Sequence, residues 1–276
     1  MFVWRLKVVY MKSLLTLMLI IFFLPYFKTS AAGLSLSKAT APSSTPIPIP
    51  LWSYYDFLPF MNNADNQGLV YELAALLTKH SQGRFVFKPQ YYPRRRIDRL
   101  LANGEVGLVA LVNPQWFPGK NLASSALLTG YDTILSPCDA KINALSKESI
   151  EGKRFIGVAG HRYPAISSLL SPKALKRLNS SSMHNLFKLI AYKRGDYALV
   201  PTIVALNYRS QQVISDDLIN YSPQPHRAYT RHLVYSDQQR KLYQEIEKII
   251  VTSAWRQQWQ ATLSSHNVHS LAVNRL

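Results

Sequence analysis

The sequence lacks most of the residues and motifs that indicate catalysis or covalent cross-linking. It contains a single cysteine, Cys138, among 276 residues, so no intrachain disulfide can form. Gly-x-Ser-x-Gly, His-Glu-x-x-His, a phosphate-binding glycine loop and Cys/His clusters are all missing, which removes the usual signatures of hydrolases, metalloenzymes and nucleotide enzymes. We therefore expect no catalytic residues, no metal and no cofactor. Cys138 is expected to be a buried small hydrophobe rather than a reactive thiol.

Acidic residues are scarce relative to basic ones. The chain has 15 Asp and Glu against 32 Lys and Arg, which gives a formal net charge of +17 at pH 7. This imbalance favours anionic partners, such as an acidic solute, membrane phosphates or cell-wall acids, although a solvated basic surface has the same composition. The basic residues are scattered and no zinc or helix-turn-helix pattern is present, so nucleic acid is not an expected partner.

The N-terminus has the pattern of an export signal. Three basic residues flank an apolar run at 13–24, and Ser30-Ala31-Ala32 supplies the small residues that a signal peptidase requires. The run is short for a membrane-spanning helix of ~20 residues, so cleavage is favoured over a retained anchor. We expect a signal peptide over residues 1–32 and a periplasmic protein. Residues 33–48, rich in Ser, Thr, Ala and Pro, are expected to form a disordered linker.

Helices and strands are expected to alternate from residue 49 to 112. A strand at 49–54 precedes leucines at helical spacing, which predict a helix from about Gly68 to Gly83 with Asp65 or Asn66 as its N-cap. A strand then begins at 85–87, a short helix ends at Asn103-Gly104, and 106–112 is continuously apolar, as in a strand covered on both faces. This order predicts a parallel, doubly wound α/β sheet with right-handed crossovers.

The remainder of the chain predicts a second, smaller α/β unit and a return to the first. A strand at 228–235 is followed by one long helix from Asp237, along which Trp255 and Trp259 lie on one side. The other expected elements are an extended run at 127–137, a strand at 155–159, helices around 165–178 and 183–192, and a short strand at 197–200.

Because nothing after the last helix begins a third unit, that helix should pack back on the first unit. This predicts two lobes, one formed by 49–136 and 224–270 and the other by 137–223. Two crossing segments, near 133–137 and 221–226, would join them. The cleft between such lobes receives the loops at the carboxyl ends of the strands.

Short motifs occur in a specific order along the chain. They are Phe57-Leu58-Pro59-Phe60, Gly68-Leu69 with Glu72-Leu73, Asn103-Gly104-Glu105, Gly157-Val158-Ala159-Gly160, Arg194-Gly195-Asp196-Tyr197-Ala198, and the final helix with Trp255 and Trp259. In this order the chain resembles the family 3 extracellular solute-binding proteins of amino-acid uptake systems. The resemblance covers nearly all of the mature chain. It implies a two-lobed type II periplasmic-binding fold with a doubly wound sheet in each lobe and two hinge crossings.

The resemblance also implies ligand-binding residues. Phe57 holds the position of the aromatic residue that stacks on the ligand in the family, with Tyr54 and Phe60 as helpers, although Phe57 and Phe60 could equally be core residues. In the second lobe, the turn after the glycine-rich strand end offers backbone N–H groups to a carboxylate. That turn contains His161, Arg162 and Tyr163; Arg162 would add a fixed charge, and His161 is expected to be structural rather than catalytic.

Two departures from the family put its usual ligand in question. The family's arginine after the third strand, which clamps an α-carboxylate, is replaced by a stretch from Asn113 to Pro118 that contains no arginine. The aspartate that receives the α-ammonium is replaced by Pro201. Arg94 and Arg95 at the start of a helix, and Trp116 at a strand end, are candidate replacements, although the arginines could also be a solvated basic helix start.

The sequence thus predicts a non-enzymatic periplasmic protein, a monomer, that closes over a small anionic or partly aromatic solute. Its partner would be an ABC-transporter permease or a membrane sensor. Two alternatives stay open. One is a periplasmic enzyme on the same scaffold, similar to cyclohexadienyl dehydratases, with Asp56, Glu72, Glu105 or Asp132 as its acid. The other is a degenerate member that acts as a protein-interaction module.

Overall fold

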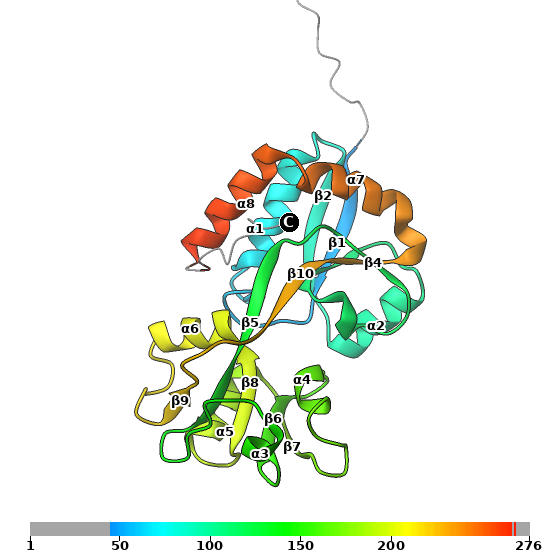
Figure 1. Cartoon of the computed structure of the whole chain (residues 1–276). Helices are drawn as coiled ribbons and strands as arrows, with labels where there is room; N and C mark the ends of the chain where they lie inside the picture. Colours follow the sequence, from blue (N-terminus) through cyan, green and yellow to red (C-terminus); the bar gives the residue numbers. More distant parts are fainter. Residues whose placement is uncertain (1–44, 267, 269–276) are drawn as a thin grey trace, which may run out of the picture. The chain divides into compact units, whose positions relative to one another are not determined.

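The structure is a computed structural model that describes residues 45–266 and 268, all within the unit Pro42–Leu276 (Figure 1). The expected signal peptide and most of the expected linker lie outside these residues. The elements in chain order are β1 (Ile47–Ser53), α1 (Leu69–His80), β2 (Phe85–Tyr91), α2 (Arg94–Ala102), β3 (Leu108–Val112), the 3-10 turn η1 (Pro114–Trp116), β4 (Asn121–Ala123), β5 (Leu128–Pro137), α3 (Lys147–Ile150), β6 (Arg154–Val158), α4 (Pro164–Ser167), β7 (Lys176–Ser180), α5 (Met183–Ala191), β8 (Tyr197–Pro201), α6 (Thr202–Ser210), β9 (Ile219–Tyr221), β10 (His226–Ser236), the 3-10 turn η2 (Asp237–Gln239), α7 (Arg240–Ile250) and α8 (Ser253–Ser265).

The strands of the described residues form one mixed sheet in the order β2-β1-β3-β10-β5-β8-β6-β7, with β4 paired to β10 and β9 to β5. Strand β1 runs parallel to β2 and β3, and β6 runs parallel to β7 and β8. The expected parallel order therefore occurs within each half of the sheet. Strands β5 and β10 are antiparallel to their neighbours, which makes the sheet mixed rather than parallel throughout.

The chain passes between the two halves of the sheet on two neighbouring strands, β5 and β10 (Figure 1). Strand β5 pairs with β10 over Leu128–Asp132 and then with β8 over Asp132–Leu135. Strand β10 pairs with β5 near its start and with β3 and β4 near its end. The two passages are thus hydrogen-bonded to each other rather than separate threads.

Helix α1 begins at a glycine rather than at the predicted side-chain cap. Its N-cap is Gly68, with φ 107° and no side-chain hydrogen bond, so the expected capping by Asp65 or Asn66 is wrong. A Cβ atom at Gly68 would lie 2.8 Å from the carbonyl oxygen of Phe60, so this approach requires glycine. The buried face of the helix packs on β2 and on α8, which fixes the loop between β1 and α1.

The expected long C-terminal helix is two helices, α7 and α8. The break lies at Val251-Thr252, where the Thr252 hydroxyl accepts a hydrogen bond from the backbone N–H of Trp255 at 3.3 Å. Trp255 and Trp259 stack with ring centroids 5.8 Å apart, and Trp259 Nε1 donates to the carbonyl of Leu127 at 2.8 Å. This bond joins α8 to the segment that enters β5.

The expected helix at 165–178 is also wrong. Helix α4 covers only four residues, and the region then forms β7, which pairs in parallel with β6. Strand β7 has the sequence Lys-Arg-Leu-Asn-Ser and lies at the edge of the sheet, where polar side chains face solvent and leave no apolar period to read. The sequence also gave no sign of β4, α6 or β9.

None of the helices in residues 45–266 combines the length and the apolar composition that crossing a membrane would need. Cys138, expected to be buried, is half-buried, with its thiol 3.5 Å from the carbonyl of Asp216.

Candidate functional site

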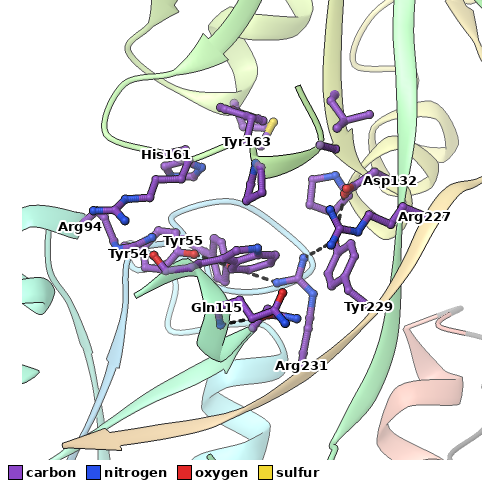
Figure 2. Close-up of a pocket in the computed structure, with 18 of the residues that line it drawn as sticks. Tyr54, Tyr55, Arg94, Gln115, Asp132, His161, Tyr163, Arg227, Tyr229 and Arg231 are labelled. Atoms are coloured by element: carbon purple, nitrogen blue, oxygen red, sulfur yellow. Dashed lines mark hydrogen bonds between the residues drawn. The ribbon is translucent and has the colours of Figure 1, made fainter. Parts of the chain in front are cut away.

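A cavity of ≈ 90 Å³ lies where the ends of strands from both halves of the sheet meet. Figure 2 shows Tyr54, Tyr55 and Arg94 on one side of it, Asp132, Arg227 and Tyr229 on the other, and His161 and Tyr163 above. The lining residues are Tyr54, Tyr55, Phe57, Arg94, Asn113, Gln115, Trp116, Asp132, His161, Arg162, Tyr163, Pro164, Ala165, Met183, Leu199, Pro201, Arg227, Tyr229 and Arg231. The lining thus combines aromatic rings, four arginines and one carboxylate.

Arg231, on β10, is the most enclosed charge of the site, with 1% of its surface exposed. One terminal nitrogen donates to the Tyr55 hydroxyl and to the Leu111 carbonyl, both at 2.8 Å. The other donates to the Tyr229 hydroxyl at 2.9 Å. Since a buried guanidinium is costly without partners, these bonds fix both the arginine and the groups that accept from it.

Aromatic rings surround the same guanidinium. Its central carbon lies 4.5 Å from the ring centre of Phe60 and 5.1 Å from that of Trp116. The faces of such rings carry partial negative charge, so they stabilise a cation without neutralising it. Arg231 therefore keeps a positive charge beneath the pocket.

A bulge in β3 supplies one of the acceptors of Arg231. The register between β3 and β10 shifts, because two steps along β10, from His232 to Val234, match three steps from Val112 to Val109. Leu111 lies inside this shift with φ 55°, a left-handed conformation that leucine rarely adopts. The bulge lets the carbonyl of Leu111 accept from Arg231.

Asp132, on β5, continues the hydrogen-bond chain that begins at Arg231. The Tyr229 hydroxyl donates to Asp132 Oδ1 at 3.0 Å while it accepts from Arg231. Burial raises the pKa of Asp132 to about 6, although the charge of Arg231 and the bond from Tyr229 act in the opposite direction. Asp132 therefore changes charge close to neutral pH. Its strand partner is Pro201.

Arg94, the first residue of α2, is locked on the other side of the pocket. Its Nε donates to Asp98 at 3.0 Å, and a terminal nitrogen donates to the carbonyl of Trp116. The guanidinium lies 3.9 Å from the ring centre of Phe117 and 5.0 Å from that of Tyr54. Arg94 thus holds the start of α2 to the loop after β3.

His161 comes from the turn after β6 and contacts the end of β1. Its ring packs edge-on against Tyr54, with centroids 5.1 Å apart. Burial, together with the charges of Arg94, Arg177 and Arg231, lowers the pKa of His161 to about 4. The imidazole is therefore neutral at pH 7, mainly because it is buried.

The turn that carries His161 is tied back to its own half of the sheet. Arg177, on β7, donates to the carbonyl oxygens of Val158 and His161, both at 3.0 Å. The Tyr163 hydroxyl accepts from the backbone N–H of Val158 at 2.8 Å, and burial raises the pKa of Tyr163 to about 12. The N–H of His161 is bonded to the carbonyl of Val158, so it is not free to bind a ligand.

The structure brings together most of the residues that the sequence singled out. Two of them do not line the cavity. Phe60 is fully buried and stacks on Tyr55 with ring centroids 4.7 Å apart, and Arg95 is exposed on the outer side of α2. The predicted residues that line it are Tyr54, Phe57, Arg94, Trp116, His161, Arg162 and Tyr163.

Sequence reasoning missed the contribution of β10 and β5 to the site. In β10, Tyr229, Arg231 and Leu233 alternate with other residues and so share one face. An arginine on that face, between a tyrosine and a leucine, was the available signal. Asp132 was considered only as an acid for the enzyme alternative. Within the described part of the chain, no three His, Cys, Asp or Glu side chains are grouped so that they could hold a metal ion.

The fold and the site geometry define a two-lobed α/β protein with the type II periplasmic-binding fold, and the comparison with solved structures confirms this predicted fold class. An ancestral arginine-binding protein bound to arginine superposes with a TM-score of 0.66 at 13% identity, covering 79% of this chain and 99% of its own. The ligand-binding core of GluR0 from Nostoc punctiforme, in complex with L-glutamate, gives a TM-score of 0.62 at 12% identity, covering 78% and 98%.

The periplasmic VFT2 domain of BvgS from Bordetella pertussis is also similar, with a TM-score of 0.61 at 14% identity and coverage of 79% of this chain and 92% of that domain. No protein-family model matches the sequence, and no curated protein matches it significantly. At these identities the likeness extends to the fold.

Proposed function

We propose that the protein is a periplasmic solute-binding protein that captures a small anionic or partly aromatic solute between two closing lobes. The lobes would be formed by 49–136 with 224–270 and by 137–223. The main support is the cavity itself, which both halves of the sheet line with arginines and aromatic rings. Its volume of ≈ 90 Å³ suits one small molecule rather than a peptide.

The charge of the lining supports an anion rather than a cationic solute. Four arginines line the cavity, whereas Asp132 is its one carboxylate. The similar proteins include one bound to arginine and one in complex with L-glutamate. A guanidinium ligand would meet repulsion from the arginines in this pocket, and an anion would relieve it.

The captured solute would be delivered to an ABC-transporter permease or presented to a membrane sensor, with the protein acting as a monomer. Both roles use the same event, in which the lobes close over the solute and bury it. The periplasmic location in this proposal depends on cleavage after Ala32, which lies outside the described residues.

A thermal-shift screen of the mature protein tests the proposal. The panel contains amino acids, dicarboxylates, aromatic acids and short peptides, and a ligand at ~100 times its dissociation constant should add ~2.7 kcal/mol of stability. Arg162→Ala and Trp116→Ala should each weaken the binding of the ligand found by this screen much more than Arg256→Ala on α8 does. Equal effects of the three variants would show that the cavity is not the binding site.

A second candidate function is favoured by the carboxyl group of Asp132, which lines the cavity, accepts from the Tyr229 hydroxyl and has its pKa raised by burial to about 6. A carboxyl group with such a pKa can act as a general acid near neutral pH, as a dehydratase of the cyclohexadienyl type would need. Turnover of prephenate or arogenate, abolished in Asp132→Asn, would establish this enzyme in place of the binding protein. No response to any solute would instead favour a protein-interaction module.

A further inference from the structure

The four arginines of the cavity differ in whether a carboxylate balances them. Arg94 forms an ion pair with Asp98 at 3.0 Å. Arg231 is linked through the Tyr229 hydroxyl to Asp132. Two of the four positive charges therefore have a negative counterpart, which is Asp98 outside the cavity lining for Arg94 and Asp132 in the lining for Arg231.

The other two, Arg162 and Arg227, have no hydrogen bond or ion pair from their side chains to any other described residue, and both are exposed. They enter the cavity from different elements. Arg162 belongs to the turn after β6. Arg227 belongs to β10 (Figure 2). The cavity thus carries two arginines on separate elements whose side chains bond to no described residue, although the charge of Arg227 also acts on Asp132.

The backbone around Arg227 is unusual. The pairing of β10 with β5 shifts register between His226 and Ala228, and Arg227 lies in this bulge with φ 45°. A bulge redirects one side chain relative to the strand, and a left-handed backbone at a residue other than glycine is unfavourable. In this bulge the side chain of Arg227 lies beside the cavity.

The potential inside the cavity points the same way. His161 stays neutral at pH 7, because burial and three neighbouring arginines lower its pKa, so it adds no charge of its own. The lining arginines and their two carboxylate partners leave a surplus of two positive charges. An occupant with a single negative charge would balance only half of that surplus.

We propose that the solute carries two negative charges, as a small dicarboxylate or a phosphate monoester does, and that Arg162 and Arg227 together bind this charge. This inference rests on the proposed solute-binding function and narrows its ligand class. A guanidinium can donate two parallel hydrogen bonds to a carboxylate or phosphate, so each arginine can hold one anionic group.

Matched probes that differ in charge test the inference by calorimetry at pH 7.5. The probes are butanoate against succinate, and benzoate against phthalate and phenyl phosphate. Each dianion should bind at least about tenfold more tightly than its monoanion, because each added charge-assisted contact contributes about that factor or more. Succinate and phthalate against phenyl phosphate separate dicarboxylates from phosphate esters.

Two variants tie the preference to the named residues. Arg162→Gln and Arg227→Gln should each reduce the ratio of monoanion to dianion dissociation constants to near one, while benzoate itself loses less affinity. Arg95→Gln, an exposed arginine on α2 outside the cavity, is the control and should leave the ratio unchanged. Both substituted residues are exposed, so the variants should fold.

Two results would overturn the inference in distinguishable ways. If benzoate and butanoate bind as tightly as their dianions, the dianion preference is wrong and the solute-binding function stands. If none of the five probes binds at concentrations up to about 10 mM, where even a weak site would be occupied, both the dianion preference and the proposed anionic ligand class are wrong.

Discussion

Arg231 shows how one buried side chain can hold together residues that are far apart in the sequence. It bonds to Tyr55 after β1, to Leu111 in β3 and to Tyr229 in β10. All three acceptors are oxygen atoms near the floor of the cavity, so losing the guanidinium would leave several polar groups without a partner.

The first prediction concerns this residue. Arg231→Met fills similar space but removes the donors, and we expect it to lower the free energy of unfolding by about 3 kcal/mol, since unpaired buried polar groups are costly. Urea unfolding measures the change. Arg227→Met, at an exposed arginine of the same strand, should change stability by no more than about 0.5 kcal/mol. An Arg231→Met protein as stable as the parent would refute the structural role.

The second prediction concerns the charge of Asp132. Its pKa of about 6 lies above the ordinary value, so between pH 4 and 6 the folded state holds a proton that the unfolded state has released. Stability contributed at this site is therefore present at low pH and is lost as pH rises towards 6. Asp132→Asn removes the penalty while retaining an acceptor for Tyr229.

We expect Asp132→Asn to be more stable than the parent at pH 7.5, by roughly 2 to 3 kcal/mol, and similar to it at pH 3.5. Unfolding curves at the two pH values measure the difference. Asp237→Asn, at an exposed carboxylate, serves as the control. A stability difference that is the same at both pH values would show that Asp132 is not buried in its charged form.

At the scale of elements, the sequence predicted the helices and strands whose apolar residues recur at a regular spacing. It missed the elements that lack such a spacing. Helix α1, with its leucines, and the continuously buried β3 were predicted within about three residues of their observed bounds. Strand β7 was read as helix because only its pairing with β6, not its own side chains, makes it a strand. Sequence periodicity cannot report such tertiary pairing.

The junction of α7 and α8 gives the third prediction. Thr252 accepts from the N–H of Trp255 and caps α8, which holds Trp255 and Trp259 in the core. Thr252→Ala should lower the free energy of unfolding by about 1 kcal/mol, the usual cost of removing such a cap. Ser253→Ala, at the next and exposed position, should cost much less by the same thermal or urea measurement. If the two variants are equally stable, the cap contributes nothing.

At the scale of the whole molecule, the sequence predicted the fold class but only part of the site. The order of helices and strands was sufficient to predict the type II periplasmic-binding fold. The charges in the cavity were not predicted, because they depend on which face of β10 and β5 points inward. The antiparallel direction of those two strands depends on the strands with which they pair, and the sequence of a single strand does not report its partners. The sequence therefore named Arg94, Trp116 and Arg162 but not Arg231.

The fourth prediction follows from the net charge of +17, or +13 after loss of the four basic residues in 1–32. A basic protein attracts anions over distances of about 10 Å at low salt, and added salt screens that attraction. The association rate of an anionic ligand should fall several-fold when NaCl is raised from about 20 to about 300 mM, because the long-range attraction is then screened. The dissociation rate should change little. Stopped-flow tryptophan fluorescence measures both rates, with Trp116→Phe identifying the share of the signal that comes from the cavity. Salt dependence confined to dissociation would contradict long-range attraction.

The pairing of β5 with β10 makes the connection between the lobes a single two-stranded ribbon. Arg227, one of the two arginines proposed to bind the solute, lies on that ribbon with the cavity residues Asp132 and Tyr229, in the part that would twist if the lobes close as proposed. Occupancy of the cavity would then act directly on the torsion of the ribbon, with no relay through distant elements. Stiffening either strand would slow closure and weaken capture together.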